Sequence, residues 1–103
     1  MAGTRITSGT LAANVVTPLT FAKYYSGIDV VNRGSTDIFA RTDAINPTVA
    51  GDDCEVIPAG TAATLVNLQG TDDPGAWPAA GTDGTDVRLI STGASAFTVA
   101  GTN

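Results

Sequence analysis

The apolar residues of this sequence come in short runs rich in β-branched and aromatic side chains, and turn-forming residues separate the runs. No stretch keeps an apolar stripe at helical spacing for three turns, whereas short runs bounded by Gly, Asn, Asp and Pro are typical of strands. The sequence therefore predicts an all-β fold. The expected strands cover residues 15–21, 27–32, 37–42, 54–57, 62–68, 87–91 and 96–100.

Two of these segments show the alternation that half-buried antiparallel strands require. Ile38, Ala40 and Thr42 fall on one face of their strand, and Phe97 and Val99 share a face of the last strand. Turn-forming residues predict a β-hairpin over residues 28–42 and a second one around residues 91–96. About seven short strands favour a small antiparallel β-sandwich, with a β-barrel as the alternative.

Two segments fall outside this pattern. Residues 1–14 are small and polar, and we expect them to form an N-terminal arm that is ordered only against a neighbour. Residues 70–85 surround a single Trp77 with Gly, Asp, Pro, Ala and Thr, which predicts a long loop. Because 103 residues are too few for a second core, residues 15–103 are expected to form one β-sandwich domain.

The core of such a domain must be thin, since Val, Ile, Leu and Phe together supply only 23 of the 103 residues. A small domain with so little apolar volume is marginal by itself. Contacts with other subunits or with a larger assembly add stability by mass action. We therefore expect a homo-oligomer or a protein that docks on a larger structure.

The charge of the chain narrows the choice of partner. Ten acidic and five basic residues give a net charge of -5, which disfavours nucleic acid and anionic membranes. The apolar runs are far shorter than the roughly 20 residues that span a bilayer. The first residues also lack the features of a signal peptide. We expect the protein to be made in the cytosol and to remain there until it is assembled into a larger structure.

The side chains that carry most enzyme chemistry are scarce. The chain has no histidine and a single cysteine, Cys54, so it lacks the usual general base and the usual zinc ligands. Acidic pairs at residues 52–53 and 72–73, and the segment 83–86, favour turn chemistry over a cation site, because no calcium-loop spacing is present. We expect no enzymatic activity, no cofactor and no metal.

The aromatic residues are the best candidates for contacts with a partner. Trp77 in its loop either caps the sandwich or enters a pocket of another protein. Tyr24 and Tyr25 are consecutive, so one of them is expected in the core and the other at the surface. Together with three residues of the arm, the predicted partner-binding residues are Arg5, Ile6, Leu11, Tyr24, Tyr25 and Trp77.

Four segments also resemble small virion proteins of tailed phages, notably phages that infect actinobacteria. They are VVNRG (residues 30–34), IFAR (38–41), NPTVAGDD (46–53) and VIPAG (56–60). In length, acidity, and richness in Ala, Gly and Thr, the chain is similar to capsid decoration proteins. That resemblance implies a cementing role on the capsid surface, with the major capsid protein as partner and a small oligomer, a trimer being favoured.

Two other functions stay open on the sequence. The chain could be another virion part, such as a head-to-tail connector or a tail protein. It could also be a host-facing adhesion module, in which Trp77, Tyr24 and Tyr25 would stack on glycan or cell-surface polymer.

Overall fold

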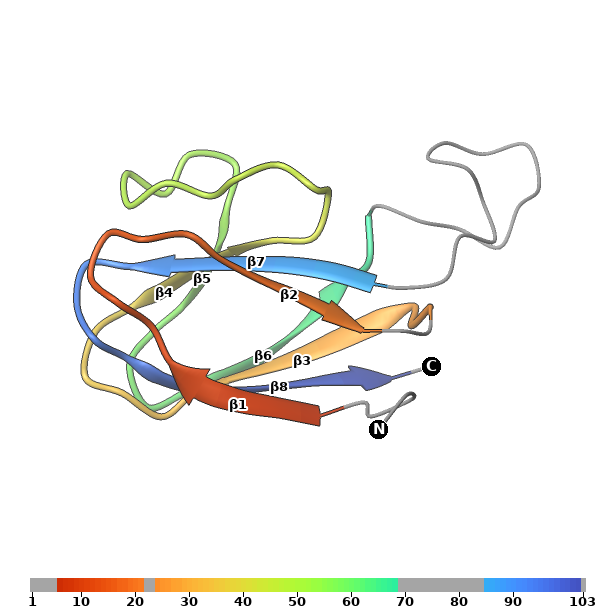
Figure 1. The fold of residues 1–103 in the computed structure, drawn as a ribbon, viewed down its shortest axis with the longest axis horizontal. Coiled ribbons are helices and arrows are strands. Elements are labelled where there is room, and N and C mark those ends of the chain that lie inside the picture. Colours follow the sequence, from red (N-terminus) through yellow and green to blue (C-terminus); the bar gives the residue numbers. More distant parts are fainter. Residues whose placement is uncertain (1–5, 22–23, 69–84, 103) are drawn as a thin grey trace.

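The computed structural model describes residues 6–21, 24–68 and 85–102, and these residues form two antiparallel four-stranded sheets packed face to face (Figure 1). The predicted all-β sandwich is thus confirmed, and the described residues form eight strands where seven were expected. None of the described residues belongs to a helix long and apolar enough to cross a membrane. The strands are β1 (Ile6–Thr10), β2 (Thr17–Phe21), β3 (Gly27–Asn32), β4 (Ile38–Arg41), β5 (Glu55–Ile57), β6 (Ala62–Val66), β7 (Thr85–Ser91) and β8 (Ala96–Thr102).

The additional strand, β1, lies where the N-terminal arm was expected. Ile6–Thr10 pairs along its whole length with β8 at the edge of a sheet. The chain beyond it is also tied to the fold, because the amide of Leu11 donates to the carbonyl of Ser95 and that of Asn14 to Ser91. The arm prediction is therefore wrong for residues 6–14. Small polar side chains suit an edge strand, whose ladder is made by the backbone.

The two hairpin predictions are also wrong, because the strands on either side of each turn belong to different sheets. Sheet A has the order β1-β8-β3-β6 and sheet B the order β2-β7-β4-β5. Every step between consecutive strands crosses from one sheet to the other except β4 to β5. Eight antiparallel strands wound in this way form a double-stranded β-helix, or jelly roll. Turn residues alone do not distinguish a hairpin from such an arch between sheets.

A buried asparagine holds the two arches together. Asn32 is 1% exposed, and its Nδ2 donates to the carbonyls of Thr36 and Ile57, each at 2.8 Å. Its Oδ1 accepts from the amide of Gly34 at 3.0 Å and from the hydroxyl of Ser95 at 2.8 Å. The side chain thereby uses all four of its hydrogen-bonding positions. It joins the β3–β4 arch, the end of β5 and the β7–β8 arch in one network.

A glycine is needed at position 34 because the arches leave no room for a side chain there. The backbone angle is not the reason, since the φ of Gly34 lies outside the left-handed region. A Cβ atom at this position would lie 2.6 Å from the Cα of Ser95 and 2.8 Å from the amide nitrogen of Ala96. The close approach of the two arches therefore needs a residue without a side chain.

The core lies between the sheets and consists of inward-facing residues from β2 to β8, together with Leu11 and Tyr25 from the connections. Tyr25 is part of it, with its ring edge-on to Phe21 at a centroid distance of 6.0 Å and 86° between planes. Gly101 lies under the same ring, since a Cβ there would be 2.3 Å from Tyr25 Cδ2. The buried apolar cluster is Leu11, Phe21, Tyr25, Ile28, Val30, Ile38, Ala40, Ile57, Leu65, Val87, Leu89, Phe97 and Val99.

The two sheets differ on their outer faces. The long β4–β5 connection, residues 42–54, folds over the outside of sheet B, where Pro47 is buried and Asn46 Oδ1 accepts from Arg88 at 2.8 Å (Figure 1). Gly51, at φ 82°, lies against the ring of Phe39 in the same layer. The outer face of sheet A is different, because its described side chains are exposed or half-exposed.

Replacing the buried asparagine tests the network. We expect Asn32→Ala to lower the free energy of unfolding by about 3 kcal/mol, because the buried partners of Asn32 then lose a hydrogen bond without gaining water. Urea denaturation of the parent and variant chains measures this difference.

Asn46→Ala is the matched control, since it removes the same side chain at an exposed position. We expect it to cost less than about 1 kcal/mol. Equal losses for the two variants would show that the arches do not depend on Asn32.

Candidate functional site

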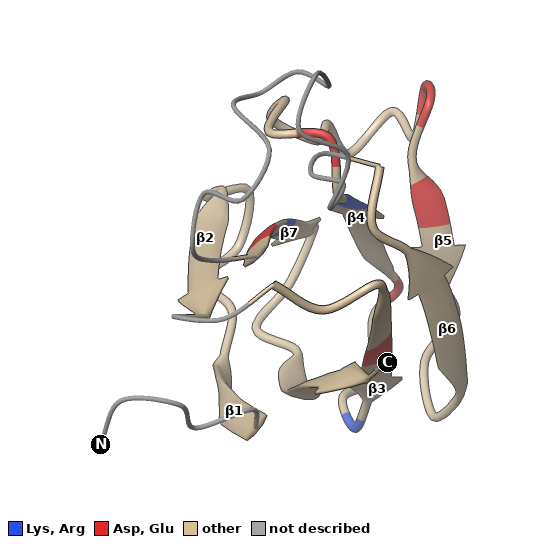
Figure 2. Ribbon diagram, turned by 90° about the vertical axis from the view of Figure 1, so that its right-hand side faces the viewer, with Lys and Arg blue, Asp and Glu red and all other residues tan. Residues whose placement is uncertain are grey.

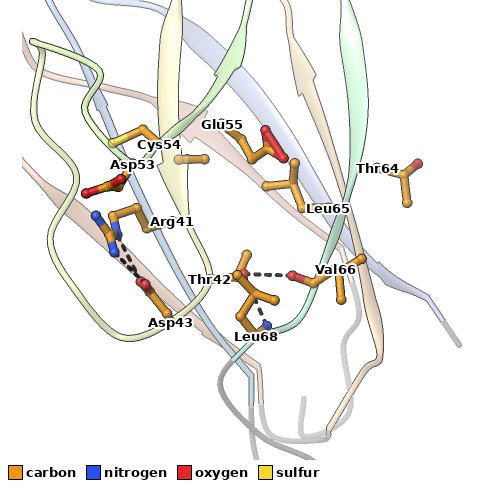
Figure 3. A pocket seen from close by; sticks show the side chains of 11 residues that line it. Arg41, Thr42, Asp43, Asp53, Cys54, Glu55, Thr64, Leu65, Val66 and Leu68 are labelled. Carbon is orange, nitrogen blue, oxygen red and sulfur yellow. Dashed lines mark hydrogen bonds and ion pairs between the residues drawn. The ribbon is translucent and has the colours of Figure 1, made fainter.

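The open side of the sandwich carries a groove between the edge strands of the two sheets. β5 ends sheet B and β6 ends sheet A, and Figure 2 shows them along the same side of the molecule. The pairing of β4 with β5 stops at Ala40–Glu55, so the edge of β4 beyond this point is open to the groove. The groove has a volume of about 450 Å³ and is drawn in Figure 3. It is lined by Ala40, Arg41, Thr42, Asp43, Asp53, Cys54, Glu55, Thr64, Leu65, Val66 and Leu68.

The groove has the most exposed large apolar side chains of the described residues on one wall. Val66 is 68% exposed and Leu68 is 69% exposed, while Leu65 between the two sheets is buried. Ala40 of β4 is also buried and lines the opposite sheet. Exposed aliphatic side chains beside an apolar floor make this side a surface that gains stability when a partner covers it.

Thr42 connects the two walls of the groove. Its hydroxyl donates to the carbonyl of Val66 at 2.7 Å and accepts from the amide of Leu68 at 3.3 Å (Figure 3). The threonine itself is 4% exposed. One side chain at the end of β4 therefore satisfies two backbone groups at the end of β6 and keeps the groove at a fixed width.

The edge of β6 also directs backbone groups to the open side. The amide of Asn32 donates to Thr61, and the amide of Asn67 donates to Ser26, so every second residue of this ladder bonds to β3. The residues between them, Ala62, Thr64 and Val66, direct their amides and carbonyls away from β3. Sheet A has no further strand beyond β6 in the described part of the chain. The strand contains neither a charged residue nor a proline, which are common means of protecting an edge.

Acidic groups form the rim of the groove on the side of β5. Glu55 and Asp53 are exposed, and Figure 2 shows the acidic positions on β5 and on the turn before it. Arg41 pairs mainly with Asp43, with its Nε 3.0 Å from Asp43 Oδ1, and it interacts more weakly with Asp53. The hydrogen bond from Arg41 lowers the pKa of Asp43, and the same bond raises the pKa of Arg41. The groove therefore suits a partner that is apolar in one part and basic in another.

The groove contains one thiol, that of Cys54. Cys54 is half-exposed, and its thiol donates to the carbonyl of Asp52 at 3.2 Å. Within the described ranges, no three acidic or cysteine side chains are grouped so that they could hold a metal ion. The site offers apolar contact, backbone hydrogen bonds and negative charge, which are the elements of a binding surface.

The structure places the described contact residues of this prediction in different surroundings and brings none of these into the groove. Ile6 is 47% exposed on β1, and Tyr24 is half-exposed. Leu11 and Tyr25, at 1% and 6% exposure, lie in the core, so their prediction as contact residues is corrected. As expected, one of the two tyrosines joins the core. Arg5 and Trp77 lie outside the described residues.

The groove itself was not predicted from the sequence. Its signal is present in residues 65–68, where Leu65, Val66 and Leu68 place apolar side chains on both faces of one strand and its continuation. A strand that packs on the core with one face and meets solvent with the other is apolar only on its core face. A strand with apolar residues on both faces indicates a second contact surface.

The ion pair of the groove predicts a pH dependence. Because folding lowers the pKa of Asp43, the pair stabilises the protein above the unfolded-state value of about 3.9. This contribution is lost as the pH falls through the lower pKa of the folded state. We expect Asp43→Asn to be less stable than the parent at pH 7, by less than about 1 kcal/mol for a partly exposed pair, and the difference to vanish at acidic pH.

Denaturant unfolding between neutral and acidic pH measures this effect. Asp52→Asn is the control, since Asp52 is exposed and forms no ion pair in the described part of the chain. A difference between parent and Asp43→Asn that stays constant down to the lowest pH would contradict the assignment.

Comparison with known proteins gives the fold and no family. No protein-family model matches the sequence, and no curated protein matches it either. A solved structure that the chain resembles is a de novo designed double-stranded β-helix, with 13% sequence identity and a TM-score of 0.54. The alignment covers 94% of this chain and 97% of the designed one. The likeness agrees with the strand order of the two sheets and assigns the chain to the double-stranded β-helix fold.

Proposed function

We propose that this protein is a decoration protein of a tailed phage, which docks on the outer surface of the assembled capsid and stabilises it. The four segments that resemble small virion proteins support this proposal. They form consecutive elements of the fold, in which residues 30–41 form the end of β3, the first arch and β4. Residues 46–60 form the layer over sheet B, β5 and the turn after it. The resemblance thus follows one continuous part of the structure.

The fold is compatible with this role. Jelly rolls occur in viral capsid proteins, in lectins and in cupins, so the fold alone does not select among them. The observation that carries the proposal is the open groove, where the exposed Val66 and Leu68 lie beside an acidic rim. A binding surface on a small acidic scaffold is what a docking protein needs.

The groove also indicates the chemistry of the docking partner. An extended segment can add to the edge of β6 through the outward amides and carbonyls of Ala62 and Thr64. An apolar residue of that segment would cover Leu68, and a basic residue would meet Asp53 and Glu55. We propose that the major capsid protein supplies this segment at its outer surface.

Many weak contacts are enough for such a role. A capsid lattice presents the same site many times, and a protein that bridges neighbouring subunits gains avidity from simultaneous contacts. Binding also favours the folded form of a protein whose core is thin. The stabilisation is mutual, since the shell with bound copies resists disruption better than the bare shell.

The adhesion hypothesis loses support from the position of Tyr25. Stacking on a sugar requires an exposed ring face, whereas Tyr25 is buried against Phe21. Of its three proposed stacking residues, only Tyr24 is both described and accessible.

Binding to purified shells tests the proposal. We expect the parent chain to bind expanded shells of the encoding phage saturably and to raise their resistance to heat. Replacing Val66 and Leu68 together by Asp should weaken binding by at least about tenfold, because each apolar side chain of this size contributes more than about 1 kcal/mol when it is buried.

A variant with Val15→Asp and Ile45→Asp is the matched control, since both residues are 52% exposed and lie outside the groove. It should bind like the parent. Equal weakening by the two variants would exclude the groove as the docking site. Binding to host cells in the absence of shells would instead favour the adhesion module.

A further inference from the structure

The outer face of sheet A is a second candidate surface, which adjoins the groove along β6, where Thr64 belongs to both. We name this surface the bare face. It carries outward-facing side chains of the four strands and of Arg33, which directly follows β3. We define it by Ser8, Asp29, Val31, Arg33, Thr64 and Thr98. The side chains around these residues are mostly small and uncharged. The corresponding face of sheet B is covered by residues of the β4–β5 connection.

Side-chain hydrogen bonds join all four strands across the bare face. Ser8 on β1 bonds to Thr98 on β8 at 2.9 Å, and Arg33 Nε donates to the same Thr98 hydroxyl at 3.1 Å. On the other side of β3, the hydroxyl of Thr64 donates to Asp29 at 2.6 Å. The two charged groups are therefore held in fixed positions before any partner binds, which lowers the entropic cost of binding.

The charge of the bare face restricts what can cover it. The chain carries a net charge of -5, yet among the described residues this face has one acidic residue, Asp29, and one basic residue, Arg33. The groove is acidic, so two grooves would repel each other. Two copies of this chain can therefore approach closely at the bare face, because repulsion from charges elsewhere is screened beyond about 8 Å at physiological ionic strength.

The positions of the two charges point to one arrangement. Asp29 and Arg33 each lie two residues from Val31 along β3, and Figure 2 shows an acidic position within this strand and a basic position just past its end. A two-fold axis through Val31 would place Asp29 of each copy against Arg33 of the other. Such an isologous contact is the commonest form of a homodimer interface.

We propose that the bare face is the interface with a second copy of this chain, related by a two-fold axis at Val31. The two A sheets then pack about 10 Å apart, as aligned sheets in a sandwich do. Two Val31 side chains meet at the axis, and two Asp29–Arg33 pairs close the contact on either side. This proposal does not depend on the capsid role, since it follows from the side chains of sheet A alone and two copies can associate without a shell.

The size of the bare face is sufficient for such a contact. Four strands about 4.8 Å apart, with five to seven residues each at about 3.3 Å per residue, cover roughly 19 Å by 18 Å. Two such faces amount to roughly 700 Å² in projection, which is the size of a weak, reversible contact. A reversible dimer at micromolar concentration is therefore expected.

Exchange of the two charges tests this arrangement by sedimentation equilibrium of the full chain. Arg33→Glu and Asp29→Lys each create two like-charge contacts in the dimer and should weaken it by about tenfold or more. The variant with both changes restores opposite charges and should dimerise like the parent. Asp52→Lys, on the layer over sheet B, changes charge outside this face and should have no effect on dimerisation beyond a small change in net repulsion.

Each other result would overturn the proposal. A parent chain that is monomeric throughout the micromolar range, or trimeric, has no two-fold contact of this kind. A dimer that both single variants leave unchanged uses a different surface. A double variant that stays monomeric while its thermal unfolding matches the parent would show that the two charges do not pair across the axis.

Discussion

The fold of this protein depends on the hydrogen bonds of one buried side chain, that of Asn32. Its Nδ2 donates hydrogen bonds to two carbonyls, and its Oδ1 accepts two hydrogen bonds. The partners come from both arches and from the end of β5. Ser91 extends the network, because its hydroxyl lies 2.7 Å from that of Thr36 and donates to the carbonyl of Asp37. These bonds stabilise the arched form of the two turns, between β3 and β4 and between β7 and β8. Without them, hairpins in which both strands stay in one sheet would compete with the arches.

The winding that these arches impose determines which surfaces stay available. The β4–β5 connection alone, among the connections between the described strands, joins two neighbours of one sheet and does not cross between the sheets. It folds instead over the outside of sheet B, where Pro47 is buried. Sheet A keeps an uncovered outer face, and the short β5 leaves the side next to β6 open. A domain with a thin apolar core thus presents two adjoining contact surfaces, one acidic and grooved, the other carrying one charge of each sign among its described residues.

Local patterns in the sequence predicted the strands well, since alternation and turn residues act over a few positions; Gly27–Asn32 was predicted to the residue. Sheet partners could not be predicted, because the bonds of Asn32 to Ile57 and Ser95 join residues far apart in the chain. The same limit explains β1, whose ladder with β8 is made by the backbone, and Leu11, whose burial depends on the β7–β8 arch. The groove combines residues of β4, β5 and β6, so it exists only once the sheets have assembled.

If this domain docks on a viral shell, as we propose, purified virions must contain it in many copies. Quantitative mass spectrometry against the major capsid protein gives this number. We expect a fixed ratio between the two proteins, because a lattice presents the same site many times. A few copies per particle would place the protein at a single vertex or in the tail, and its absence from virions would exclude a docking role on the shell.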